Sequence, residues 1–413
     1  MFERPQGGER ALLVQLALPG VDADEALAEF RELALSAQAE VLDCLLGSRA
    51  SPDAKYYIGL GKVEALKELV VAHEAELVLI NHELSPSQER NLERALQCRV
   101  VGRSGLILDI FAQRARTFEG KLQVELAQLQ HLSTRLIRGW THLERQKGGI
   151  GLRGPGETQL ETDRRLLRAR IKSINAKLEK VRRSRLENRR ARKKASLVTV
   201  SLVGYTNAGK STLFNALTGE AIYAADQLFA TLDPTMRKIE LPGGVAVILA
   251  DTVGFIRDLP HHLIEAFRAT LEETEEADLL LHVIDISDPS WRETEQTVLQ
   301  VLTEIGVADI PRIQVFNKID QQEGWLPKLT QQGEGCKVWL SAKTGAGLEL
   351  LKEAIVTQLH GVIIEEEVFI DPSQAKLRAK LYSLDAVLNE RDAENGGWFL
   401  TVKLTQAQKQ RLF

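Results

Sequence analysis

Apolar and polar positions alternate in blocks along the first 111 residues. Apolar runs at 11–18, 40–46, 77–81 and 99–101 predict strands, and amphipathic stretches at 24–36, 62–73 and 87–97 predict helices. Ser85 and Pro86 precede the last of these stretches as an N-cap and a first-turn residue. Strands that alternate with helices indicate a small parallel α/β layer.

Within this layer, Gly59-Leu60-Gly61-Lys62 has two interpretations. It could be a phosphate-binding loop, or it could be a tight turn from a strand into a helix. A lone GxGK is a weak motif, so the turn is favoured.

The next segment has the spacing of two long helices. Five leucines keep helical spacing before Gly139 closes the run: Leu122, Leu126, Leu129, Leu132 and Leu136. A second apolar stripe follows a seven-residue repeat, interrupted only by the polar Asp163/Arg164 step: Leu160, Leu167, Ile171, Ile174, Leu178 and Val181. Because such a stripe forms a coiled-coil seam, we predict a long antiparallel helical hairpin over residues 116–195.

Between these helices, residues 148–156 contain five glycines and one proline in nine positions, and we expect them not to be helical. A flexible connector is the simplest interpretation, but helix links usually need only about 2–8 residues. The neighbouring Arg145, Lys147 and Arg153 suit close contact with an anionic partner. We therefore favour a functional tip over a connector.

The second predicted helix is strongly basic. The net charge is −4, but residues 161–195 carry fifteen basic and four acidic residues, a local charge of +11. A solvated helix face is the usual explanation for such a run, yet here the excess has one sign and lacks acidic partners four residues away. Attraction to nucleic-acid phosphates is favoured instead. The residues that we expect to bind RNA are Arg153, Arg182, Arg183, Arg189, Arg190 and Arg192.

A chain of 413 residues is too long for one ordinary core. We predict an N-terminal α/β domain at 1–115, the hairpin at 116–195 with its tip at 148–156, a doubly wound domain at 196–360 and a small α/β domain at 361–413. Because no apolar run is long enough for a membrane span and the three cysteines form no CxxC pair, we expect a cytoplasmic protein with buried, reduced thiols. We also expect a monomer.

The strongest motif follows an apolar strand at 197–203. Residues 204–211 read GYTNAGKS, which is the GxxxxGKS phosphate-binding loop in its strand–loop–helix context. Lys210 is expected to bridge the β- and γ-phosphates and the Ser211 hydroxyl to bind Mg²⁺. The amide of Asn207 could hold K⁺, or it could only stabilise the loop. The expected phosphate contacts are Gly204, Tyr205, Thr206, Asn207, Ala208, Gly209, Lys210, Ser211 and Thr212.

A second buried strand, 245–250, ends in the DxxG motif of residues 251–254. Asp251 is expected to hold Mg²⁺ through a water, and the Gly254 N–H to sense the γ-phosphate. The stretch FATLDPT at 229–235 occupies the switch I position, where Phe229 should contact the nucleotide. Thr231 is the preferred second Mg²⁺ ligand and Thr235 the alternative. Lys210, Thr231 and Gly254 are thus the expected catalytic residues.

Two further strands end in base-recognition motifs, NKxD at 317–320 and SAK at 341–343. The Asp320 carboxylate can accept from both N1–H and N2–H₂ of guanine, whereas adenine would leave it unpaired. The remaining expected contacts are Asn317, Lys318, Ser341, Ala342 and Lys343. Five motifs in this order indicate a GTPase, although Phe255 occupies the position of the usual water-orienting Gln, so intrinsic hydrolysis should be slow.

With these residues in view, the chain resembles the HflX family of bacterial ribosome-associated GTPases. The most specific matches are GGIGLRGPGETQLETDRR at 148–165, GYTNAGKSTLFN at 204–215, FATLDPT at 229–235 and DTVGFI at 251–256. The resemblance implies a factor that binds the large ribosomal subunit and its RNA and splits stalled ribosomes, notably under heat or antibiotic stress. It also implies that the hairpin reaches toward the peptidyl-transferase centre and that ribosomes stimulate the GTPase.

Two other functions remain open. One is a ribosome-assembly or RNA-remodelling GTPase that uses the hairpin as an RNA chaperone. The other is a regulatory switch whose hairpin grips a helical protein, which the basic excess disfavours. The predicted fold class is α/β multidomain, with a P-loop GTPase domain preceded by a small α/β domain and a long helical hairpin and followed by a small α/β domain.

Overall fold

The structure, a computed structural model, describes residues 9–19, 22–139, 155–194, 198–219, 227–257, 260, 273–331, 335–360, 363–384, 386–393, 396–405 and 412. The chain forms two compact units. The first comprises Met1–Asn188, Ala225–Asp233 and Asp258–Ala269, and the second comprises Arg189–Ala224, Pro234–Arg257 and Thr270–Phe413.

The first unit begins with a four-stranded parallel sheet of order β2-β1-β3-β4. Its strands and helices are β1 (Arg10–Ala17), α1 (Ala23–Ser36), β2 (Glu40–Ser48), α2 (Leu60–Ala72), β3 (Leu77–Ile80), α3 (Pro86–Leu96), β4 (Arg99–Gly102) and α4 (Arg103–Arg114). Ser85 and Gln88 form a capping box at the start of α3, as Ser85-Pro86 predicted. The predicted alternation is therefore confirmed, while α4 is an element that the sequence did not predict.

In the structure, Gly59 is the N-cap of α2, and Leu60–Lys62 form the first turn of that helix, after a loop at residues 49–58 that follows β2. Gly59 has φ +84° and precedes α2. The Lys62 ammonium donates to the Leu46 carbonyl at 2.8 Å, so it is bonded to β2. The expectation of a tight turn from a strand into a helix is therefore wrong, because the stretch opens α2 after the loop at residues 49–58 instead of following β2 directly.

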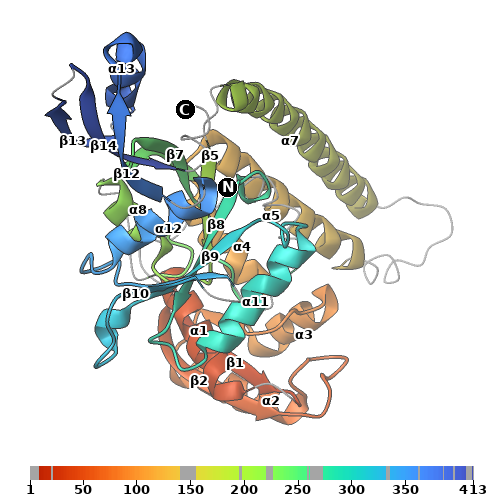
Figure 1. Cartoon of the computed structure of the whole chain (residues 1–413). Coiled ribbons are helices and arrows are strands. Elements are labelled where there is room, and N and C mark those ends of the chain that lie inside the picture. Colours follow the sequence, from red (N-terminus) through yellow and green to blue (C-terminus); the bar gives the residue numbers. More distant parts are fainter. Residues whose placement is uncertain are drawn as a thin grey trace. The chain divides into compact units, whose positions relative to one another are not determined.

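The hairpin consists of α5 (Phe118–Gly139) and α7 (Pro155–Lys194), the longest helix in Figure 1. Their seam buries Leu122, Leu126 and Ile174, against which Leu129, Ile171 and Leu178 pack. The predicted seam is thus confirmed at these six residues, whereas Leu132 of the predicted stripe is exposed. The expectation of a non-helical tip is wrong at its end, because α7 already begins at Pro155, a residue suited to the first helical position. The rest of the tip, residues 148–154 with Arg153, lies outside the described residues.

The second unit contains a seven-stranded sheet of order β10-β11-β9-β8-β5-β7-β6. Its elements are β5 (Val198–Gly204), α8 (Lys210–Thr218), β6 (Thr235–Leu241), β7 (Val245–Asp251), β8 (Leu279–Asp285), α11 (Trp291–Glu304), β9 (Arg312–Asn317), β10 (Lys328–Thr330), β11 (Cys336–Trp339) and α12 (Leu348–His360). Only the edge strands β6 and β10 are antiparallel to their neighbours. The five parallel strands bring their carboxyl ends to one edge, where ligands bind in sheets of this class.

A three-stranded antiparallel sheet of order β12-β14-β13 follows, with one helix. Its elements are β12 (Ile363–Ile370), α13 (Ala375–Ser383), β13 (Val387–Asp392) and β14 (Trp398–Thr405). Ile370, Leu381, Leu400 and Val402 form its core. Figure 1 shows it as the dark blue part of the chain. The predicted small α/β segment is therefore present.

The cysteines differ from the expectation. All three cysteines are free, but only Cys336 is buried, while Cys44 and Cys98 are half-buried. The expectation that all three thiols are buried is therefore wrong. None of the helices that the structure describes combines the length and apolar character needed to span a lipid bilayer.

Candidate nucleotide-binding site

The loop between β5 and α8 carries the GxxxxGKS motif. Lys210 is the first residue of α8 and is buried, and its ammonium donates to the carbonyls of Gly204 at 3.1 Å and Tyr205 at 2.6 Å. Burial lowers the Lys210 pKa to about 8, and the nearby Asp251 carboxylate partly offsets this shift. The loop thus wraps around one cation beside the N-terminus of a helix, as a phosphate cradle requires.

Asn317 ties three of the predicted motifs together. Its side-chain amide donates to the Ala208 carbonyl and its carbonyl oxygen accepts from the Ala342 N–H, both at 2.9 Å, and its side chain is buried. Gly209 has φ +90°, and a Cβ there would lie 2.3 Å from the Asn317 amide nitrogen. Only glycine allows this close approach. The P-loop, the NKxD motif and the SAK motif are therefore joined by direct hydrogen bonds.

Ser211 and Asp251 could hold a magnesium ion. The Ser211 hydroxyl donates to the Asp251 carboxylate at 2.8 Å, so two oxygen ligands of the kind that Mg²⁺ prefers already converge. Thr235 begins β6 directly opposite Asp251 in the strand register. The structure thus brings the alternative threonine to this pair, whereas Thr231 belongs to the first unit. The residues present fit the ion.

Directly after DxxG, the chain pairs with the P-loop. The Phe255 N–H donates to the Gly204 carbonyl at 3.1 Å, and the Thr206 N–H donates to the Phe255 carbonyl at 2.7 Å. The Tyr205 hydroxyl accepts from the Arg257 N–H at 2.8 Å. The Phe255 side chain is 1% exposed, so it anchors this segment in the core instead of facing a reacting water.

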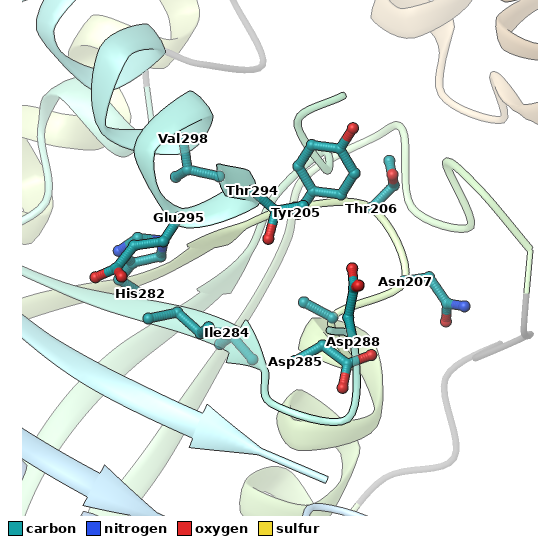
Figure 2. Close-up of a pocket in the computed structure, with 12 residues that line it drawn as sticks. Tyr205, Thr206, Asn207, His282, Ile284, Asp285, Asp288, Thr294, Glu295 and Val298 are labelled. Atoms are coloured by element: carbon teal, nitrogen blue, oxygen red, sulfur yellow. The ribbon is translucent and has the colours of Figure 1, made fainter. Parts of the chain in front are cut away.

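A cavity of about 130 Å³ is lined by residues 205–208 of the P-loop, by residues of β8 and α11, and by Asp288 between them. Figure 2 shows His282 and Glu295 on one side of it and Asp285 and Asp288 on another. Burial, helped by Arg312 and Lys210, lowers the pKa of His282 to about 3, so its ring is neutral. Burial also raises the pKa of Glu295. The sequence predicted the P-loop side of this cavity but not the β8 and α11 side, because His282 and Glu295 belong to no motif.

The base-recognition residues lie in two environments. Asn317, Ser341 and Ala342 are buried, whereas Asp320 and Lys343 are exposed. Lys318 adopts φ +67° and pairs with Asp285 at 2.6 Å. Sequence reasoning also missed Asp285, although its position at the end of β8, beside Asn317 in the register, is a usable signal.

Comparisons with known proteins agree with these motifs. Family models match residues 24–112 (GTP-binding GTPase N-terminal), 114–192 (GTP-binding GTPase middle region), 199–318 (50S ribosome-binding GTPase) and 328–412 (HflX C-terminal domain). The chain is 54% identical over 414 residues to GTPase HflX of Escherichia coli strain K12, covering 100% of this chain and 97% of that protein. The chain belongs to the HflX family of GTPases.

Other HflX proteins are similarly related. GTPase HflX of Magnetococcus marinus is 46% identical over 96% of this chain and 92% of its own length. Among solved structures, a GTP-binding protein from the archaeon Sulfolobus solfataricus in complex with GDP is 25% identical, with a TM-score of 0.45 over 85% of this chain and 98% of that one. Membership of the HflX family makes this chain a GTP-binding, GTP-hydrolysing enzyme and confirms the resemblance and the predicted fold class.

Proposed function

We propose that this HflX GTPase binds the large ribosomal subunit and uses GTP to dissociate stalled ribosomes under stress, with its hydrolysis stimulated by the ribosome. The observation that carries the proposal is the hairpin, in which an apolar seam is buried between the two helices while the exposed side of α7 is rich in basic residues. The match of residues 199–318 to the 50S ribosome-binding GTPase family supports the choice of partner.

The basic face lies along α7. Eight described basic side chains of this helix are exposed: Arg165, Arg168, Arg170, Lys172, Lys177, Lys180, Arg182 and Arg183. Arg170 binds Glu125, and Arg183 pairs with Glu179 four residues earlier in the helix. The expectation that acidic partners are absent at this spacing is therefore wrong for Arg183. The remaining excess still favours ribosomal RNA, because phosphate binding releases counterions.

We propose that the nucleotide site works through the residues that the P-loop brings together. Lys210 contacts the β- and γ-phosphates, while Ser211 and Asp251, with Thr231 or Thr235, hold the magnesium ion. The ion supplies charge neutralisation at the phosphates when bound. Asn207 is exposed in the P-loop with φ +61°, and we propose on the basis of this position that its amide oxygen contacts K⁺.

Buried Phe255 cannot orient a water, so we propose that the large subunit completes the catalytic site. Free protein should then hydrolyse GTP slowly, and ribosomal subunits should raise kcat by about a hundredfold or more. A preparation that hydrolyses GTP equally fast with and without large subunits contradicts this step.

RNA binding is tested by sedimentation with large subunits at several salt concentrations. The variant neutralises Arg182, Arg183, Arg189, Arg190 and Arg192. The matched control neutralises five exposed basic residues of the second unit: Arg237, Lys238, Arg292, Lys376 and Lys380. The hairpin variant should bind more weakly and with a shallower salt dependence, by up to about four in the logarithmic slope. Equal binding by the two variants would remove the basic face from the interface.

The tip is tested separately. Replacing residues 148–156 with a short Gly-Ser closure should leave GTP binding intact and weaken ribosome binding, while activity at the peptidyl-transferase centre is impaired. If this variant dissociates ribosomes as well as the wild type, the tip is a connector. If subunits in assembly respond but mature ribosomes do not, the assembly function replaces the proposed one.

A further inference from the structure

Part of switch I belongs structurally to the first unit. Residues 227–233, which include Phe229, Thr231 and Asp233, pack with α1, α4 and α5. We call them the switch I segment. They continue through Pro234 directly into β6, whose first residue, Thr235, lies opposite Asp251.

One end of the switch I segment is fixed by Asp233. Its carboxylate accepts from the backbone N–H of Arg116 at 2.8 Å, from that of Thr117 at 2.9 Å and from the Thr117 hydroxyl. Thr117 immediately precedes α5, and its hydroxyl oxygen also accepts from the Gly120 N–H at 2.9 Å. Thr117 therefore caps the first turn of α5, and Asp233, 116 residues away in the chain, completes this cap by accepting from the Thr117 N–H and hydroxyl.

The approach of Asp233 depends on Gly120. A Cβ on Gly120 would lie 2.1 Å from the Asp233 carboxylate, so any larger residue would displace this side chain. The contact therefore requires both the Asp233 carboxylate and a glycine at position 120.

The other end of the segment is held by buried contacts. The Leu228 N–H donates to the Ser36 hydroxyl at 3.1 Å, and the Phe229 ring packs edge-on against Phe111 with centroids 4.7 Å apart. Leu228 and Phe229 are at most 5% exposed. Phe229 adopts φ +55°, a strained conformation for a side chain of this size that packing must maintain. Thr231 therefore lies in a short span anchored on both sides.

We infer that Asp233 is a positioning residue for GTP hydrolysis, which fixes switch I by completing the cap of α5 and links the hairpin to the nucleotide site. The segment is covalently joined to β6, two residues after Asp233, so a shift of the α5 N-terminus moves switch I. A partner that grips the hairpin would then act on hydrolysis by this route. The positioning role applies to the free protein, and the link to a hairpin partner rests on the proposed function.

The principal test replaces Asp233 with Ala. Small misplacement of a positioning element can cost orders of magnitude in rate, and we expect kcat of the free protein and subunit-stimulated kcat to fall about tenfold. KM for GTP and affinity for GDP should change less than twofold, because P-loop and base contacts are untouched. Amide exchange at Arg116 and Thr117 should accelerate, since both N–H groups lose their acceptor.

A matched control replaces Asp22, which caps the N-terminus of α1 by accepting from the N–H of Asp24 and Glu25, at the opposite end of that helix from Ser36. Asp22→Ala should leave kcat unchanged. Thr117→Ala should reduce kcat in the same direction as Asp233→Ala, and Thr117→Ser, which keeps the hydroxyl, should restore it.

The outcomes separate the two claims. If wild-type protein is not stimulated by large subunits, the proposed function fails, and the kcat of free protein still decides the role of Asp233. If Asp233→Ala and Asp22→Ala give the same kcat, with accelerated exchange at Arg116 and Thr117 proving that the cap is lost, the inference is overturned. Failure of Thr117→Ser to restore kcat also contradicts it.

Discussion

Asn317→Ala should strongly reduce the affinity of the site for guanine nucleotides. The substitution removes two hydrogen bonds of 2.9 Å and leaves the Ala208 carbonyl and the Ala342 N–H unpaired where the Asn317 side chain was buried. Each orphaned buried group costs about 1–3 kcal/mol, so together they cost about 2–6 kcal/mol. If GDP binding must re-order the P-loop and the SAK loop, the lower value of about 2 kcal/mol corresponds to about a 30-fold loss of affinity.

The assay is a fluorescence titration with a labelled GDP at 25 °C, accompanied by thermal unfolding. Gln314→Ala is the matched control, because Gln314 lies on the same strand and its amide binds Glu295 instead of a nucleotide motif. The control should bind GDP within twofold of wild type. If Asn317→Ala protein is folded and also binds GDP within threefold of wild type, the tie between the three motifs contributes nothing to binding, and the reasoning is refuted.

Four further predictions follow from the same structure. Asp320→Asn should weaken GTP binding and favour xanthosine triphosphate, and unchanged GTP affinity in a titration would remove Asp320 from the base site. Ile174→Ala should destabilise the hairpin by about 2–5 kcal/mol in thermal unfolding without altering GTP affinity, because this fully buried residue fills the seam. Affinity for GDP should fall up to about tenfold per pH unit above pH 8, because only protonated Lys210 attracts phosphate and its pKa is about 8. Calorimetry above pH 8 should detect proton uptake on GDP binding, and a GDP affinity that stays constant up to pH 9.5 would contradict this role of Lys210. Tyr205→Phe should speed GDP release several-fold by freeing the Arg257 N–H, and Arg257→Ala, which keeps that N–H, should not.

The linear motifs were predictable because each depends on residues close together in the chain. GxxxxGKS, DxxG, NKxD and SAK each require one strand and the loop after it, so apolar runs and glycines identify them. The seam at Ile174 was predictable for the same reason, since a seven-residue spacing fixes which side chains face a partner helix.

Contacts between distant segments were not predictable in this way. Asp233 completes the cap of α5 from 116 residues away, and no local pattern marks a carboxylate as part of a cap for another element. The position of Thr235 opposite Asp251 depends on strand register. The cavity beside His282 depends on how β8 and α11 pack beside the P-loop. Each of these features is set by tertiary packing.

The most direct test of the proposed function is whether the protein dissociates intact ribosomes. Ribosomes are incubated with the protein and GTP, a non-hydrolysable GTP analogue or GDP, and then separated on sucrose gradients. We expect GTP and the analogue to convert intact ribosomes into subunits, and GDP or a Lys210→Ala variant to give little conversion. Ribosomes that stay intact with wild-type protein and GTP, under conditions where the same protein binds large subunits, would contradict it.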